Sequence, residues 1–161
     1  MNLKPLLARI ALALAASSAT LITSQLAAAE HVYDISGKAY KGECTSCHIA
    51  FPPQLMSGPS WRTLMSSLDK HFGTDASLDP KAALEIGQYL EKNASTRRAD
   101  PPVPLKEAPR ITTSAWFVKE HREVPTAMWK SKAVGNVSNC AACHTRADQG
   151  DFSERTLRLP R

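Results

Sequence analysis

Cysteine and histidine side chains occur together in a five-residue pattern that appears twice in the chain, at residues 44–48 and 140–144. Each copy has two cysteines separated by two residues and followed directly by a histidine. Two thiols at this spacing can add across the two vinyl groups of haem, and the adjacent imidazole can bind the iron. The pattern therefore predicts two covalently bound haem c groups. The residues concerned are Cys44, Cys47 and His48 in the first motif and Cys140, Cys143 and His144 in the second.

Other uses of the cysteine pairs fit the sequence less well. Zinc ribbons place their two pairs about 15–20 residues apart, whereas positions 48–139 separate the pairs here. A thioredoxin-like redox centre requires a βαβ setting, for which the sequence gives no signal. Two disulfides are common in exported proteins, but they leave the histidine after each pair without a role. Haem attachment explains all six residues.

A second axial ligand for each iron must come from the remaining histidines or methionines. The candidates are His31, His71, His121, Met56, Met65 and Met128. His71 and His121 each end an apolar helical face beside aromatic residues, so we expect these two to be the ligands. His71 is nearest in sequence to the first motif and His121 to the second, which favours that pairing, while the crossed arrangement stays open. His31 lies in an irregular lead-in, and core packing is the simpler role for Met65.

Two histidines on each iron would fill both axial positions and leave none for a substrate. Ligation by methionine and histidine would raise the reduction potential relative to this arrangement. The histidine assignment therefore predicts electron transfer at low potential and not oxygen chemistry.

Residues 1–29 have the pattern of a secretory signal peptide. Lys4 and Arg9 form a positive start, residues 10–19 are apolar and alanine-rich, and three alanines precede the expected cleavage site before Glu30. An uncleaved membrane anchor is the alternative, but the apolar stretch is short for a span and several serines and threonines follow within it. We expect a periplasmic protein that is exported through a cleavable signal peptide.

The basic composition does not indicate a nucleic-acid partner. The whole chain has a formal charge of +5, and residues 1–29 hold two basic residues and no acidic one, which leaves +3 after cleavage. The four propionates of two haems lower that sum to −1 before the irons are counted. The remaining charges are interspersed, without the basic runs of a nucleic-acid-binding surface.

Helix signals recur along the chain, and no alternating apolar and polar run is long enough for a sheet. Asp79 and Pro80 are a strong start signal, because aspartate caps a helix and proline suits its first turn. The helices that we expect lie at 40–49 (with the first motif), 59–70, 80–93 and 114–122 (after a threonine cap at 112 or 113). The chain is therefore predicted to be all-α and loop-rich, with little or no sheet.

The end of the chain gives weaker signals. A short turn is expected after Pro125, and Ser138 is expected to cap a helix that carries the second motif. Residues 148–161 have the composition of a loosely packed tail.

A proline-rich segment at 99–110 indicates a stiff, extended connector between two parts of similar size, each with one motif. The predicted organisation has four parts: a signal peptide at 1–29, an N-terminal haem lobe at 30–98, the connector at 99–110, and a C-terminal haem lobe at 111–161.

Taken together, the mature chain resembles the small soluble dihaem cytochromes c of proteobacteria. The matching features are the early motif followed by two prolines, the run from Trp61 to Met65, the run from His71 to Gly73, the segment 79–90, and the late motif preceded by His121. The resemblance implies a small cytochrome c-like fold in which His48, His71, His121 and His144 are the axial ligands. It also implies a b-type membrane cytochrome and a small soluble haem protein as redox partners, and it leaves room for peripheral membrane contact.

Three functions compete at this point. The leading one is an electron-transfer protein that relays electrons from a membrane donor to a soluble haem acceptor, with no catalytic role. The alternative is a small dihaem enzyme, a peroxidase or a sulfur-compound dehydrogenase, with one labile axial position. Dihaem peroxidases are generally much longer than this chain. The third is a structural zinc protein, which a visible spectrum would distinguish at once.

Overall fold

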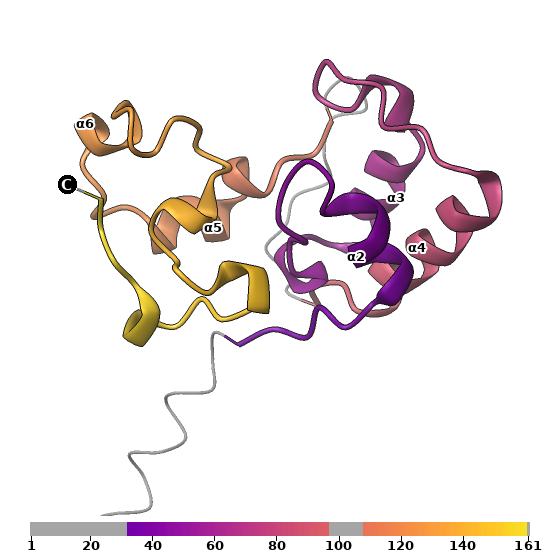
Figure 1. Ribbon diagram of the computed structural model, residues 1–161, viewed down its shortest axis with the longest axis horizontal. Helices are drawn as coiled ribbons and strands as arrows, with labels where there is room; N and C mark the ends of the chain where they lie inside the picture. The colour runs from indigo at the N-terminus through magenta and orange to yellow at the C-terminus, as the bar shows by residue number, and fades with distance from the viewer. Residues whose placement is uncertain (1–31, 97–107, 161) are drawn as a thin grey trace, which may run out of the picture. The chain divides into compact units, whose positions relative to one another are not determined.

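The computed structural model describes residues 32–96 and 108–160, which form short helices joined by long loops (Figure 1). Within these two ranges the structure contains α-helices and 3₁₀ turns but no β-strand, and the few β-type pairings are isolated bridges. The predicted all-α, loop-rich class is therefore confirmed. From Tyr33 onward, the described residues belong to one compact unit.

Several sequence predictions lie outside the described residues. They are the signal peptide at 1–29, the candidate ligand His31, and most of the connector at 99–110. The division into haem lobes at 30–98 and 111–161 stays a prediction. In the described part of the chain, no helix has the length and apolar character that crossing a bilayer requires.

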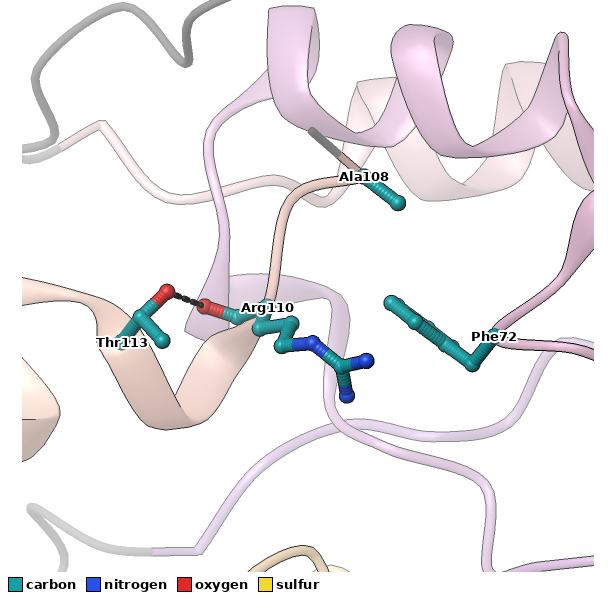
Figure 2. A pocket seen from close by; sticks show the side chains of 4 residues that line it. All are labelled: Phe72, Ala108, Arg110 and Thr113. Carbon is teal, nitrogen blue, oxygen red and sulfur yellow. Dashed lines mark hydrogen bonds between the residues drawn. The ribbon is translucent and has the colours of Figure 1, made fainter. Parts of the chain in front are cut away.

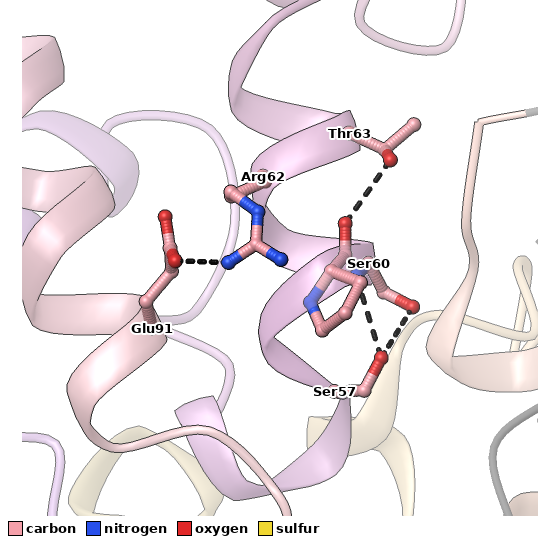
Figure 3. Close-up of polar contacts among 6 residues, drawn as sticks. Ser57, Ser60, Arg62, Thr63 and Glu91 are labelled. Carbon is pink, nitrogen blue, oxygen red and sulfur yellow. Dashed lines mark hydrogen bonds and ion pairs between the residues drawn. The ribbon is translucent and has the colours of Figure 1, made fainter. Parts of the chain in front are cut away.

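Helices α3 (Gly58–Met65) and α4 (Pro80–Lys92) lie side by side (Figure 1). Arg62 of α3 and Glu91 of α4 form an ion pair between them (Figure 3). Both side chains are more than a third exposed, so the pair contributes less than about 1 kcal/mol. The attraction between the helices comes mainly from the apolar faces that they turn toward each other.

Both helices start at polar caps, which supply acceptors for backbone N–H groups that have no partner within the helix. The Ser57 hydroxyl accepts a hydrogen bond from the Ser60 N–H at 3.3 Å at the start of α3 (Figure 3). A carboxylate oxygen of Asp79 accepts from the Lys81 N–H at 2.9 Å at the start of α4. The predicted starts are confirmed. The predicted end of the first of these helices is wrong, because α3 ends at Met65 and a separate 3₁₀ turn follows at Leu68–Lys70.

A third helix, α2 (Lys38–Cys44), packs with α3 and α4 around one hydrophobic cluster. Ile86 and Leu90, which lie one turn apart on α4, are 0% and 1% exposed, as their spacing predicts. A fully buried side chain of this size contributes about 1.5–3 kcal/mol. The cluster consists of Tyr40, Ala50, Met56, Trp61, Leu64, Ile86 and Leu90. It fixes α2, and with it the start of the first motif, against the other two helices.

The loop that follows the first motif, at residues 51–53, is anchored to this cluster by two side-chain hydrogen bonds. The Tyr40 hydroxyl donates to the Phe51 carbonyl at 2.8 Å. The indole N–H of Trp61 donates to the Pro53 carbonyl at 2.7 Å. The two prolines of this loop have no backbone N–H to donate. The hydrogen bonds from Tyr40 and Trp61 therefore help to hold the loop in place.

The C-terminal part contains two short helices, α5 (Ala115–Glu120) and α6 (Thr126–Trp129). The cap of α5 is Ser114, whose hydroxyl accepts from the Phe117 N–H at 3.1 Å, so the predicted threonine cap is wrong. The turn expected after Pro125 is present as α6. The remaining residues form 3₁₀ turns and loops around the second motif.

The end of the chain is folded back onto the second motif, so the predicted loose tail is wrong. Asp151 and Ser153 are 9% and 4% exposed. The Thr145 hydroxyl donates to the Thr156 carbonyl at 2.7 Å, and the Arg158 N–H donates to the Cys143 carbonyl at 2.8 Å. These bonds join residues 11 or more positions apart in the sequence, and no local sequence pattern indicates them.

Candidate haem sites

The first motif begins at the last residue of α2 and continues in turns. The helix predicted through residue 49 ends at Cys44, which is half-buried, while Cys47 is exposed. Burial, together with the charge of Glu43, raises the pKa of the Cys44 thiol to about 11. Redox-active Cys-x-x-Cys pairs lower this pKa to stabilise a thiolate. Cys44 therefore lacks the electrostatic setting of a thioredoxin-like centre.

Two residues that follow His48 closely in the sequence, Ile49 and Phe51, contact its ring. Its Nδ1–H donates to the Ile49 carbonyl at 2.6 Å, since a carbonyl oxygen can only accept. The ring of Phe51 lies beside it, with ring centroids 4.8 Å apart. A proton on Nδ1 leaves the Nε2 lone pair available to a metal ion.

His71 follows the 3₁₀ turn Leu68–Lys70, and its half-buried ring lies near His48. The two ring centroids are 6.1 Å apart, and the ring planes differ by 28°. Burial lowers the pKa of His71, and the neighbouring His48 and Arg110 lower it further. The neutral imidazole, which is the form that binds a metal, is therefore favoured.

Arg110, at the end of the predicted connector, is a neighbour of this site to which the sequence analysis gave no role. Its guanidinium lies 4.0 Å from the ring centroid of Phe72, the residue after His71 (Figure 2). These two side chains line a cavity of about 270 Å³ together with Ala108 and Thr113. The contact joins residues far apart in the sequence, so no local pattern could have revealed it.

The second motif opens with a 3₁₀ turn at Cys140–Ala142. The α-helix predicted here is absent, and Ser138 is not its cap, because the turn starts after Asn139 with no side-chain cap bond. Burial raises the pKa of the Cys140 thiol to about 11 and also raises the pKa of Cys143. Cys140 thus resembles Cys44 in having a thiol pKa that burial raises.

His121 stands at the end of α5 and is held by the helix itself. Its Nδ1–H donates to the Phe117 carbonyl at 2.9 Å. The Phe117 ring stacks on it with centroids 4.0 Å apart, and the Trp129 ring centroid lies 5.8 Å away. The ring of His144 lies 6.2 Å from His121 between centroids, with the planes at 78°.

The separations within both histidine pairs fit one metal ion between two imidazoles. An imidazole nitrogen binds a metal at about 2.0–2.1 Å and lies about 1.1 Å from its ring centroid, so two opposite ligands place their centroids about 6.3 Å apart. The observed separations are 6.1 Å for His48 with His71 and 6.2 Å for His121 with His144. In both pairs, one histidine directly follows a cysteine pair.

The structure therefore brings together the histidines that are nearest in sequence. Two of the methionines that the sequence left as alternatives belong to the hydrophobic cluster: Met56 is 4% exposed within it, and Met65 packs against it. The supporting residues Phe51, Phe117 and Trp129 were not assigned a role from the sequence. Phe51 and Phe117 could have been predicted from the sequence, because each lies within a few residues of a candidate ligand.

Comparisons with known proteins find similar chains over most of this sequence. Residues 40–152 match the family described as dihaem cytochrome c. A diheme cytochrome c from Rhodobacter sphaeroides is 37% identical, with 75% of this chain and 99% of that chain covered and a TM-score of 0.64. A diheme cytochrome type c from Shewanella baltica OS155 is 35% identical, with coverage of 77% and 93% and a TM-score of 0.67. A comparison with curated proteins finds no match.

Proposed function

Because the chain belongs to the dihaem cytochrome c family, we propose that it is an electron-transfer protein with two histidines on each haem iron. The chain carries two covalently bound haem c groups, as its family does. We assign the four thioether bonds to Cys44, Cys47, Cys140 and Cys143. His48 and His71 bind one iron, and His121 and His144 bind the other. The observation that carries this assignment is the spacing of 6.1 and 6.2 Å within the two pairs.

The protein's own residues hold the ligands and leave the chemistry to the cofactor. The bound haem supplies an iron that changes between the ferric and ferrous states. The carbonyls of Ile49 and Phe117 accept from Nδ1 of His48 and His121, which orients these rings and keeps Nε2 free for the metal. An iron held by both imidazoles of a pair would have no coordination position open to a substrate, which supports a carrier over a peroxidase or a sulfur-compound dehydrogenase.

We further propose that the protein works in the periplasm and relays electrons between a b-type membrane cytochrome and a small soluble haem protein, with peripheral membrane contact at the donor. The support is the signal-like sequence at residues 1–29 and the family resemblance. Haem staining of periplasmic and cytoplasmic fractions tests the location. Haem protein confined to the cytoplasm would contradict it. Stopped-flow mixing with membrane vesicles that hold a reduced b-type cytochrome tests the donor, and no reduction of the dihaem protein would rule this donor out.

Single substitutions of the second ligands test the assignment. His71→Ala should convert one of the two haems to a high-spin or ligand-swapped spectrum, and His121→Ala should do so for the other. His31→Ala is the matched control, since it removes a histidine that the assignment does not use. An unchanged low-spin spectrum in either of the first two variants would remove that histidine from the ligand set. A high-spin haem in the control would assign His31 instead.

A further inference from the structure

The first residues of the described chain contact the second motif. The Tyr33 N–H donates to the Gly150 carbonyl at 2.9 Å. The Tyr33 ring meets the Phe152 ring edge to face, with centroids 5.8 Å apart and planes at 69°. Phe152 in turn lies against His144, at 5.1 Å between ring centroids. A continuous row of rings therefore runs from Tyr33 to the histidine of the second motif.

Gly150 makes this approach possible. Its φ of 78° lies in the left-handed region, which side chains disfavour, and a Cβ at this position would collide with the Tyr33 carbonyl oxygen. The loop around it is tightly bonded: the Gly150 N–H donates to the Ala147 carbonyl and the Asp151 N–H to the Arg146 carbonyl, both at 3.1 Å. The loop is thus shaped to receive the backbone of residue 33.

The two histidine pairs differ in the angle between their ring planes. The planes of His48 and His71 differ by 28°, whereas those of His121 and His144 differ by 78°. The rings of Phe117 and Trp129 pack against His121. The ring that packs against His144 is Phe152, and Tyr33 packs behind Phe152.

We propose that Tyr33 and Phe152 are positioning residues that hold the His144 imidazole nearly perpendicular to His121. The N-terminal segment thereby completes the C-terminal haem site. This inference rests on the proposed function, in which His121 and His144 bind one iron. The angle between two axial imidazole planes sets the splitting of the iron d orbitals. In a ferric low-spin haem, near-parallel planes give a rhombic EPR signal, and near-perpendicular planes give a strongly anisotropic one with a single low-field feature.

The test is low-temperature EPR of the fully oxidised holoprotein and four variants. The wild type should show one rhombic signal and one strongly anisotropic signal. Tyr33→Ala should shift the low-field feature toward the rhombic position and leave the other signal in place, whereas Tyr33→Phe should keep the wild-type spectrum. Leu84→Ala is the control, because it removes an apolar side chain that is exposed on α4. It should leave the low-field feature unchanged.

Phe152→Leu keeps the apolar contact but changes its shape, and it should shift the same feature even where Tyr33→Ala lowers the yield of holoprotein. An unchanged low-field feature in both variants, or two rhombic signals in the wild type, would overturn the positioning role while leaving bis-histidine ligation standing. A high-spin haem in the wild type would instead overturn the proposed function.

Discussion

Replacing Tyr40 with phenylalanine isolates one of the two hydrogen bonds that hold the loop behind His48. Tyr40 is 3% exposed, and its hydroxyl donates to the Phe51 carbonyl at 2.8 Å. The substitution removes only the hydroxyl, so no large cavity forms. Leaving a buried acceptor without its donor costs about 1–3 kcal/mol, and the half-buried carbonyl of Phe51 can recover part of this from water. We expect a loss of about 1–2 kcal/mol in the free energy of unfolding.

Guanidinium titration of the oxidised holoprotein, followed by far-UV circular dichroism and Soret absorbance, measures this loss. In thermal unfolding, the same loss corresponds to a melting temperature lower by about 3–10 °C for a chain of this size. Tyr89→Phe is the matched control. It also removes one tyrosine hydroxyl from the same region, but that hydroxyl is exposed and lies 3.5 Å from its acceptor, the Asp34 carbonyl. We expect the control to stay within about 0.5 kcal/mol of the wild type.

The comparison has a clear failing outcome. Equal stability of Tyr40→Phe and Tyr89→Phe would mean that the buried bond to Phe51 does not hold the loop.

Three further predictions concern stability. Asp79→Ala removes the cap of α4 and should cost about 1 kcal/mol of unfolding free energy, whereas Asp79→Asn should cost little; equal losses in a denaturant titration would contradict the cap. Ile86→Ala leaves a cavity at a fully buried position and should lower the free energy of unfolding by about 2–5 kcal/mol. Leu84→Ala, at an exposed position on the same helix, should lower it by about 0.5 kcal/mol or less. Similar losses in the two variants would place Ile86 outside the core. Contact with Ser153, whose N–H donates to the Asp151 carboxylate at 3.0 Å, holds the pKa of Asp151 below its usual range. This carboxylate therefore stabilises the fold above about pH 4, and the gain is lost as pH falls through the lowered pKa. Asp151→Asn should flatten the loss of stability at acid pH, and an unchanged loss would refute the role.

Local signals account for the parts of the fold that the sequence predicted well. Asp79 followed by Pro80 marks the start of α4, and Ile86 and Leu90 at one-turn spacing mark its buried face. These signals act within a few residues and need no knowledge of the rest of the molecule. The candidate ligands were found for a similar reason, since each histidine lies beside a cysteine pair or at the end of an apolar face.

The motif segments and the C-terminal loop were predicted wrongly because distant contacts decide their shape. A helix of one or two turns has little stability of its own, so the motif residues take the turns that suit their surroundings. In the loop after the second motif, Gly150 has a left-handed backbone because residue 33 packs against it. The contact of Arg110 with Phe72 is equally invisible in the sequence.

The central claim is that both irons have histidines on both sides, and carbon monoxide tests it most directly. The fully reduced holoprotein is mixed with carbon monoxide, and the visible spectrum is followed over time. Two six-coordinate haems predict a low-spin ferrous spectrum that does not change on mixing, because His71 and His121 occupy the positions the gas would take. Rapid and complete binding at one haem would contradict the assignment and support the enzyme alternative.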